Sequence, residues 1–393
     1  MSSASSSRLA ALDALRGLVI VLMAIDHARD FFHAGAMTGV PTDLATTTPL
    51  LFATRWITHL CAPVFAWAAG AGAWLRLQRP GQSPGALARY LVWRGLGLIV
   101  LEVTVMRVAM TFSLSPTWPV LLLVLWMLGV SMMALAALQY LPLRLLLWGS
   151  LAVIALHHLA DGIRPEALGA WAGLWRVLHV PGVITPGGVV AVVGYPLVPW
   201  VAVMAAGFAM APIFTWAPEV RRRWLLAGGL IGVLGFVVLR TLNVYGDPSP
   251  WARQPSAVMT LVSFLNTTKY PPSLAFLLMT LGPAAWLLAW LDRRALRPSH
   301  PFLVFGRVPL FFYVTHFFLL HALAVAAAWW TYGGAAWSFA WMPLPSMGGP
   351  AAAFPPGFGY ALPITYVAWA AVVGLLYPAC RWWGRRDVPR TRG

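Results

Sequence analysis

Apolar runs separated by short polar connections extend along almost the whole chain of 393 residues. About ten of these runs approach the ~20 residues with which an α-helix crosses roughly 30 Å of hydrocarbon. They cover residues 12–32, 52–76, 90–110, 119–140, 143–160, 190–214, 224–243, 270–291, 302–330 and 360–382. The pattern predicts an all-α fold, a polytopic bundle of about ten transmembrane helices. We expect one domain over residues 1–393, with tails at about 1–11 and 384–393.

The composition favours a membrane protein over a soluble one. Only 10% of the residues are charged, 13% are aromatic, and the mean hydropathy is +0.74, all outside the range of soluble domains. The two cysteines, Cys61 and Cys380, lie in or beside different apolar runs. Their positions indicate neither a disulfide framework nor a zinc site, and we expect no metal.

The net charge of +16 is distributed in a way that indicates orientation. Basic residues gather in alternate connections, namely Arg76, Arg79, Arg89 and Arg94; Arg144; Arg221, Arg222 and Arg223; Arg293, Arg294 and Arg297; and the tail from Arg381. This positive-inside pattern predicts that both termini are cytoplasmic and that connections 161–189, 244–269 and 331–359 face the other side. The charge therefore indicates membrane lipid as a partner, and no nucleic acid.

The first apolar run carries ionisable residues at both ends, in the stretch DALRGLVIVLMAIDHARD. Arg16 and His27 are eleven residues apart, so in a helix they differ by about 20° in azimuth and by about 16 Å in height. An intramembrane ionisable group costs about 2.5–3.5 kcal/mol and therefore faces a cavity or a partner. The spacing predicts that both side chains face one cavity in the bundle.

Further charged residues surround His27 on this helix. Asp30 lies three residues on and can orient the imidazole, while Asp26 can pair with Arg29 or Arg55. The alternative is that these groups mark the outer interface and pair with one another.

Two other stretches present polar groups beside apolar helices. In RWITHLCAPVFAWAAGAGAWL, His59 is either a second catalytic group or a hydrogen-bonded interface histidine. In FLNTTKYPPSLAFLLMTLGP, Asn266, Lys269 and Tyr270 precede a helix whose N-terminal dipole favours an anion or a developing oxyanion. The alternative for Lys269, the only lysine of the chain, is an interfacial side chain that reaches toward water.

The stretch GRVPLFFYVTHFFLLH places Tyr313 and His316 on one face of a helix and His321 on another. His27 and His316 could in principle ligate a haem, although no motif supports this. In the third run, Arg94 and Glu102 share a face and predict an ion pair or contact with a polar cavity. In YGDPSPW, Asp247 is a weaker candidate for contact with substrate.

The chain resembles a known family in four stretches: LDALRGLVIVLMAIDHARDFF, RWITHLCAPVFAWAAG, FLNTTKYPPSLAFLLMTLGP and GRVPLFFYVTHFFLLH. These are similar to bacterial membrane proteins grouped with the heparan-alpha-glucosaminide N-acetyltransferase catalytic domain, and TKYPPS is the most distinctive block. The spacing of Arg16 and His27 also resembles the signature of the acyltransferase-3 membrane enzymes. The resemblance implies that cytoplasmic acetyl-CoA, or another acyl-CoA, donates an acyl group to an extracytoplasmic sugar amine or hydroxyl.

The resemblance also implies roles for individual residues. Arg16 and Arg94 would hold the CoA phosphates. His27 would act as general base or transient acyl carrier, oriented by Asp30 and assisted by His59. The substrate and its oxyanion would contact Asn266, Lys269, Tyr270, Tyr313 and His316.

One departure from the family bears on the catalytic residue. The lysosomal enzyme has its proposed catalytic histidine in a His-x-x-Trp-x-Gly stretch of the first lumenal loop, whereas residues 34–58 contain no histidine. Only His27, His33 or His59 can take its place, and the heparan substrate is not carried over. We also expect a bacterial-type cytoplasmic membrane location and a homodimer from the resemblance. The competing prediction is a non-enzymatic transporter, or a lipid- or glycan-binding protein, on the same scaffold.

Overall fold

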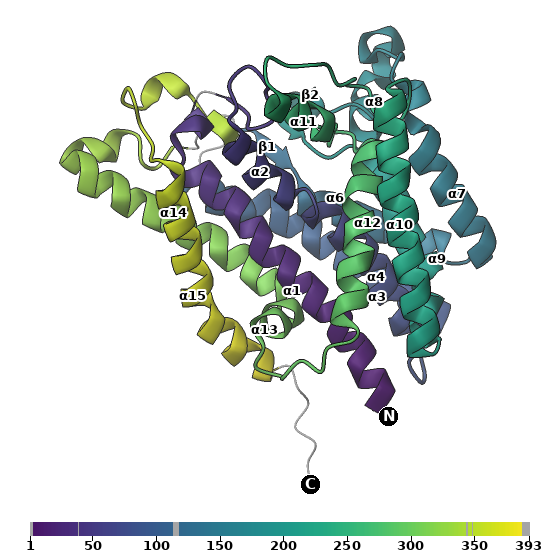
Figure 1. Cartoon of the computed structure of the whole chain (residues 1–393). Coiled ribbons are helices and arrows are strands. Elements are labelled where there is room, and N and C mark those ends of the chain that lie inside the picture. Colours follow the sequence, from purple (N-terminus) through teal and green to yellow (C-terminus); the bar gives the residue numbers. More distant parts are fainter. Residues whose placement is uncertain (1–2, 38, 113–117, 343–344, 348, 387–393) are drawn as a thin grey trace.

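A computed structural model describes residues 3–37, 39–112, 118–342, 345–347 and 349–386, and it is mostly helical (Figure 1). Its helices are α1 (Ser3–Phe32), α2 (Pro49–Thr58), α3 (Cys61–Leu77), α4 (Pro84–Leu101), α5 (Arg107–Thr111), α6 (Val124–Leu138), α7 (Leu143–Leu156), α8 (Ala172–Leu178), α9 (Leu197–Met210), α10 (Pro218–Leu242), α11 (Ala257–Leu265), α12 (Leu274–Leu291), α13 (Pro301–Arg307), α14 (Pro309–Tyr332) and α15 (Leu362–Arg386).

Each of the ten predicted apolar runs contains helix, and seven helical segments of the described chain are long and apolar enough to cross a membrane. These are Pro49–Leu77, Leu143–Ala160, Leu197–Thr215, Pro218–Leu242, Leu274–Leu291, Pro309–Ser338 and Leu362–Arg386. Helix α1 has the length but carries more charged residues than such a span allows. The chain is therefore a helical membrane protein, while the number of crossings stays a prediction.

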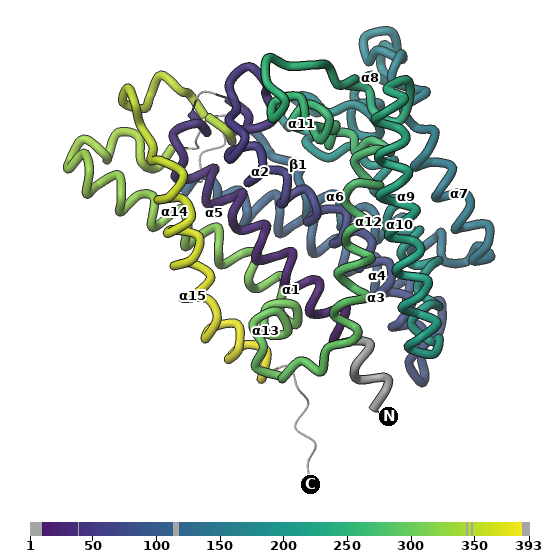
Figure 2. The backbone as a smooth tube through the Cα atoms, viewed as in Figure 1, coloured from purple at the N-terminus to yellow at the C-terminus, as the bar shows by residue number. Residues whose placement is uncertain are grey.

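Helix α1 occupies the centre of the bundle and packs against α2, α3, α12, α13, α14 and α15. It begins at the end of the bundle where α15 stops, and α8 and α11 lie at the opposite end (Figures 1 and 2). Helix α1 extends into the predicted N-terminal tail and α15 into the predicted C-terminal one. The remainder of those tails, residues 1–2 and 387–393, lies outside the described residues.

Glycines allow α1 to touch its neighbour α13 through the backbone. A Cβ added at Gly17 would lie 1.8 Å from the carbonyl oxygen of Phe302, and one at Gly306 would lie 1.7 Å from that of Asp13. Neither separation is possible for a real side chain, so only glycine permits this approach. The contact fixes α13 against the first turns of α1.

Two predicted helices are interrupted in the structure. The run 302–330 is divided at Val308 into α13 and α14, because Pro309 has no N–H to continue the hydrogen bonding of α13. The run 52–76 is divided at His59 and Leu60 into α2 and α3. Val308 leaves the helical conformation, whereas His59 and Leu60 keep helical backbone angles, so α2 and α3 continue as one apolar segment, Pro49–Leu77.

The prediction of an all-α fold missed a small sheet. Strands β1 (Val120–Leu122), β3 (Ala191–Val193) and β2 (Gly182–Ile184) lie in the order β1-β3-β2, with β1 parallel and β2 antiparallel to β3. Three-residue strands are too short to show an alternating pattern. The sheet ends next to Tyr195, which enters the site described below.

Candidate active site

His27 of α1 and His316 of α14 meet inside the bundle. The Nδ1 atom of His27 lies 2.7 Å from Nε2 of His316, and their ring centroids are 4.9 Å apart. His316 is fully buried, whereas His27 is partly exposed. The two nitrogens are too close to hold a metal ion between them, since each metal–nitrogen bond is about 2.0 Å long. The pair is therefore a hydrogen-bonded unit rather than a pair of haem ligands.

The hydrogen bonds fix which nitrogen of each neutral ring carries a proton. Nδ1 of His316 lies 3.0 Å from the carbonyl oxygen of Phe312, and a carbonyl only accepts, so this Nδ1 donates. Nε2 of His316 is then an acceptor, and Nδ1 of His27 donates to it. Nε2 of His27 consequently holds a lone pair and has no hydrogen-bond partner among the described residues. This nitrogen is available to take a proton or attack a carbonyl.

Four charged side chains from α1 and α2 bond one another near His27. We call Asp26, Arg29, Asp30 and Arg55 the charged cluster. Arg29 contacts Asp30 at 2.6 Å and Asp26 at 3.1 Å, and Arg55 bonds the other oxygen of Asp26. The exposed fractions of the Asp26 and Asp30 side chains are 13% and 18%, although Oδ1 of Asp26 is itself buried. The predicted pairing of Asp26 with Arg29 or Arg55 is confirmed for both arginines.

Asp30 does not orient His27, contrary to the prediction from spacing. Its carboxylate is bonded to Arg29, and the imidazole of His27 is held by His316 instead. Asp30 follows His27 by three residues, but Arg29 offers it a charge-assisted hydrogen bond, which is stronger than one to a neutral ring. A catalytic role for Asp30 stays a prediction.

The TKYPPS loop, residues 268–273, lies close enough to the charged cluster for Lys269 and Tyr270 to interact with it electrostatically. The ammonium of Lys269 lies 5.1 Å from the ring centroid of Tyr270 and 6.0 Å from that of Tyr195. Its charge acts on Asp26 and His27. The sequence prediction that this loop and α1 belong to one site is thus supported by their proximity.

Asp247 and Arg240 hold the TKYPPS loop in place. Asp247 accepts from the backbone N–H and hydroxyl of Thr268 at 2.9 and 3.0 Å, and from the hydroxyl of Ser273 at 2.6 Å. Arg240 donates to the carbonyl oxygens of four residues, Ser249, Ser263, Phe264 and Asn266. Asp247 therefore holds the loop with both carboxylate oxygens, and its side chain is 2% exposed; contact with substrate stays a prediction.

A carboxylate of the protein itself, that of Asp247, lies at the N-terminus of α12. Ser273 caps this helix by accepting from the N–H of Phe276 at 2.9 Å, and the carboxylate of Asp247 is bonded to the same hydroxyl. Asn266, predicted to face an oxyanion here, donates its amide to the carbonyl of Thr42 at 2.8 Å. The helix terminus is consequently occupied by the protein's own groups.

Three tyrosines lie beside Lys269 or the histidine pair, namely Tyr195, Tyr270 and Tyr313. Tyr270 donates to the hydroxyl of Tyr195 at 3.4 Å. Tyr313 packs edge-on against His27, with ring centroids 6.2 Å apart, and its hydroxyl has no partner among the described residues. A hydroxyl without a partner can donate to a substrate oxygen. Sequence reasoning missed Tyr195, which follows a strand too short to be recognised.

His59 lies at the junction of α2 and α3 and packs against Phe276, with ring centroids 5.3 Å apart. It is buried, and its Nδ1 has no hydrogen-bond partner within the described part of the chain. Buried polar atoms are nearly always paired. This orphan nitrogen is compatible with a role toward a ligand or an ordered water, and the catalytic assignment of His59 stays a prediction.

The residues predicted to bind CoA lie at the other end of α1. Arg16 is bonded to Asp13 at 3.4 Å. Ile20, Met23 and Ala24, which lie between Arg16 and His27 on the same face, are buried in the apolar core. Packed side chains, rather than the predicted shared cavity, thus occupy the direct path between the two residues.

Arg94 and Glu102 do not form the predicted ion pair. Arg94 is exposed, whereas Glu102 is buried and accepts from the backbone N–H groups of Leu125 and Trp126 at 2.7 and 3.1 Å. The carboxylate thereby caps the start of α6. The N–H groups at the start of α6 lie within hydrogen-bond distance of Glu102, whereas no bond joins Glu102 to Arg94 in the described chain.

Comparison with known proteins identifies the family. Residues 8–246 match the sequence profile described as "Heparan-alpha-glucosaminide N-acetyltransferase, catalytic". The match begins within α1, includes His27 and Tyr195, and ends at Gly246, one residue before Asp247. No curated protein matches the chain.

Proposed function

The chain belongs to the family of the heparan-alpha-glucosaminide N-acetyltransferase catalytic domain, and from this premise we propose the following reaction. The protein moves an acyl group, in the first instance acetyl, from cytoplasmic acyl-CoA to an extracytoplasmic acceptor. The acceptor is a sugar amine or hydroxyl. His27 is the general base or the transient acyl carrier.

The arrangement of His27, His316 and the Phe312 carbonyl carries this proposal. It leaves one accessible basic nitrogen, Nε2 of His27, and supports the opposite edge of that ring. A ring held in one tautomer and orientation by a second group is how histidine bases are commonly prepared for proton transfer. His316 is in this scheme a positioning residue.

In direct transfer, Nε2 of His27 takes the proton of the acceptor hydroxyl or amine while the acceptor atom attacks the thioester carbonyl. The carbonyl oxygen becomes an oxyanion, and the cation of Lys269 and the free hydroxyl of Tyr313 are the donors for it. The carbon–sulfur bond then breaks. The CoA thiolate takes the proton from the His27 imidazolium, which returns the ring to its neutral form.

In the two-step alternative, Nε2 of His27 attacks the thioester itself and CoA leaves as the thiolate. The acceptor then attacks the acyl-imidazole, releasing neutral His27 and passing its own proton to the thiolate or to water. The same lone pair serves both routes. They differ in whether the protein carries acetyl in the absence of acceptor.

The position of His27 along α1 supports an acceptor on the side opposite the termini. His27 lies five residues before the helix ends at Phe32, far from the turn that carries Arg16. A donor from the Arg16 end must displace Ile20, Met23 and Ala24 or follow another path to reach Nε2. The roles proposed for Arg16 and Arg94 therefore depend on movement of these side chains.

The test is transfer of label from acetyl-CoA to a panel of amino-sugars and neutral sugars by the purified chain in membranes. We expect activity in the wild type and a loss of about 10²–10⁴-fold in His27→Ala, the usual contribution of a general base. His33→Gln is the matched control. His33 is another histidine near the end of α1, and its Nδ1 accepts only the N–H of Gly35, at 3.0 Å, among the described residues.

Three further outcomes would decide the remaining alternatives. Label that stays on the protein without acceptor, and is absent from His27→Ala, selects the two-step route. Loss of activity in His33→Gln with activity kept in His27→Ala would contradict the assignment of His27. Indifference of the wild type to CoA, together with sugar flux in vesicles, would replace the enzyme by a transporter.

A further inference from the structure

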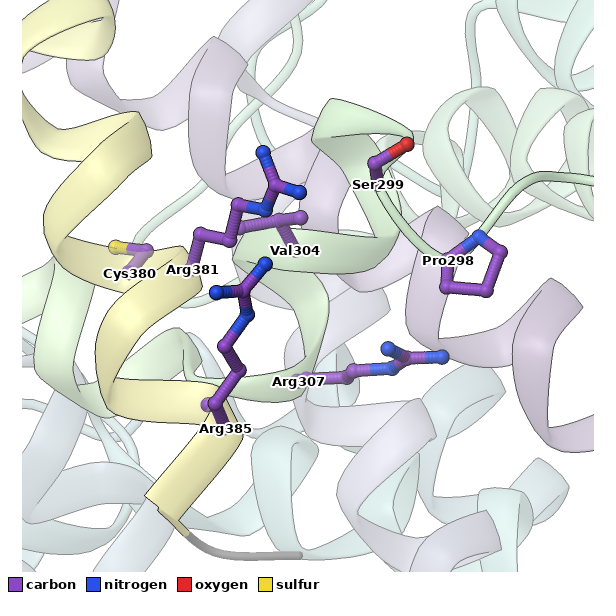
Figure 3. A pocket seen from close by; sticks show the side chains of 8 residues that line it. Pro298, Ser299, Val304, Arg307, Cys380, Arg381 and Arg385 are labelled. Carbon is purple, nitrogen blue, oxygen red and sulfur yellow. The ribbon is translucent and has the colours of Figure 1, made fainter.

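A cavity of about 280 Å³ lies between α13 and α15, at the end of the bundle where α1 begins (Figures 1 and 3). It is lined by Pro298, Ser299, Val304, Arg307, Cys380, Arg381, Gly384 and Arg385. Figure 3 shows Arg381 and Arg385 projecting from successive turns of α15, while Arg307 extends from α13 beneath Pro298. We call this cavity the arginine pocket.

The walls of the arginine pocket are fixed by the fold. Tyr377 of α15 donates its hydroxyl to the carbonyl of Ser299 at 2.7 Å, which ties the connection before α13 to α15. On its other side α13 is pressed against α1 through Gly306, whose missing Cβ leaves room for the carbonyl of Asp13. The pocket is thus formed by two anchored elements and not by a free loop.

The three arginines of the pocket have no carboxylate bonded to them in the part of the chain that the structure describes. The carboxylate of Asp13 acts electrostatically on Arg307, but it is bonded to Arg16. Three cations around one cavity repel each other unless an anion lies among them. Unlike the buried Arg221, which is paired with Asp292 at 2.8 Å, these three arginines are exposed and line one cavity together.

We propose that the arginine pocket binds the phosphate group of a ligand from the membrane–water boundary. Guanidinium groups match phosphate oxygens through paired N–H donors. The volume is at the lower limit of small-molecule sites, which suits a headgroup or the phosphate-bearing part of a larger molecule. Trp382 and Trp383, next to Arg381 on α15, are exposed as interfacial anchors are.

Two ligands carry this chemistry. One is an anionic phospholipid, since basic pockets beside transmembrane helices bind such headgroups. The other is the phosphate-bearing part of acyl-CoA, and this source rests on the proposed function. In that case the pocket would replace Arg16 and Arg94 as the place where the donor is held.

The test compares the wild type with the variant R307Q/R381Q/R385Q. The control R223Q/R293Q/R294Q removes the same charge from exposed arginines outside the pocket. Two probes are used on the full chain in nanodiscs: thermal stabilisation by phosphatidylglycerol against phosphatidylcholine, and equilibrium binding of labelled CoA in phosphatidylcholine alone. Circular dichroism and gel filtration check that each variant is folded.

We expect the pocket variant to lose roughly 100-fold in affinity for one probe while the control stays near wild type. Loss for phosphatidylglycerol identifies a lipid site, and loss for CoA identifies a donor site. Equal loss in both variants, or none in the pocket variant, overturns the proposal. If the triple variant does not fold, R385Q alone should lose about fivefold. Binding without acetyl transfer by the wild type would refute the proposed function and leave the lipid site standing.

Discussion

Two of the protein's centres of paired arginine and aspartate use their charges differently. In the charged cluster, Arg29 and Arg55 bond Asp26 and Asp30, side chain to side chain, and the carboxylates remain 13% and 18% exposed. The second centre is Arg240 with Asp247, whose side chains are each 2% exposed and 4.0 Å apart. There nearly every donor and acceptor is used on the loop that surrounds it.

The difference separates a scaffold from a site. Arg240 and Asp247 satisfy backbone groups of residues 249–273, so they determine the shape of one loop and have little capacity left for a ligand. The charged cluster leaves hydrogen-bonding capacity unused, since Oδ1 of Asp26 and Nε of Arg29 have no hydrogen-bond partner among the described residues, and Nε2 of the neighbouring His27 is free. Exposure and unused hydrogen-bonding capacity, more than the presence of charge, therefore distinguish the groups that can act on a substrate.

The largest expected effect on stability comes from breaking the scaffold centre. Asp247→Ala leaves Arg240 buried with no counter-charge and removes the acceptor of Thr268 and Ser273. Loss of one partner of a buried pair costs about 3–5 kcal/mol. We expect a marked fall in the thermal unfolding midpoint, measured by tryptophan fluorescence in detergent.

Asp247→Asn is the matched control for this prediction. It retains one acceptor oxygen for the loop and removes only the charge, so its midpoint should lie between those of the wild type and Asp247→Ala. If the free energy of unfolding of Asp247→Ala lies within about 1 kcal/mol of the wild-type value, the loop is held by other contacts.

The next effect concerns the histidine pair. His316→Phe keeps the ring packing with Phe312 and Phe317 but removes the acceptor for Nδ1 of His27. Nε2 of His27 is then no longer forced to hold the lone pair. We expect kcat to fall by roughly 100-fold, with little change in the unfolding midpoint.

A pH–rate profile distinguishes positioning from packing. If His316 fixes the tautomer of His27, the profile of His316→Phe should shift and His316→Gln, whose amide oxygen can accept, should recover part of the rate. If the pH–rate profile is unchanged and both variants lose the same amount of kcat, His316 contributes only packing.

In the charged cluster, in contrast to the scaffold centre, we expect a substitution to reduce acetyl transfer more than it reduces stability. Arg29→Gln removes the partner of Asp30, while Asp26 keeps Arg55 and both carboxylates keep access to water. We expect about 1–3 kcal/mol of destabilisation, the range for hydrogen bonds to charged groups, and a larger relative effect on transfer. Arg29→Lys serves as control. Stability loss equal to that of Asp247→Ala would remove the distinction between the two centres.

Much of this architecture could be predicted from the sequence, because hydrophobic runs report helices directly. The apolar runs each contain helix, and polar residues that are rare on apolar helices pointed to His27 and His316, which the structure brings together. Pro309 is a local signal that divides one predicted helix, and weighing it more heavily would have found the break.

Partners between distant segments could not be predicted in the same way. Helical spacing placed Asp30 beside His27, but the imidazole is bonded 289 residues away, to His316. Likewise Glu102 and Arg94 share a face, yet the carboxylate caps α6. Periodicity gives the face of a helix and not the element that packs on it, so the spacing does not show which distant group a polar side chain will bond.

The smallest effect is expected at the opposite end of α1. The bond of Arg16 to Asp13 spans one turn at 3.4 Å, with 34% of the Arg16 side chain exposed, and such pairs contribute about 0.3–0.5 kcal/mol. Arg16→Gln should therefore leave the unfolding midpoint almost unchanged. Its KM for acetyl-CoA is the informative measurement, compared with Arg79→Gln as control. A tenfold rise only in Arg16→Gln would place the donor phosphates at α1, and it would require Ile20 and Met23 to move aside during turnover. An unchanged KM would mean that Ile20 and Met23 stay packed between Arg16 and His27 during turnover. The donor would then reach His27 by another path.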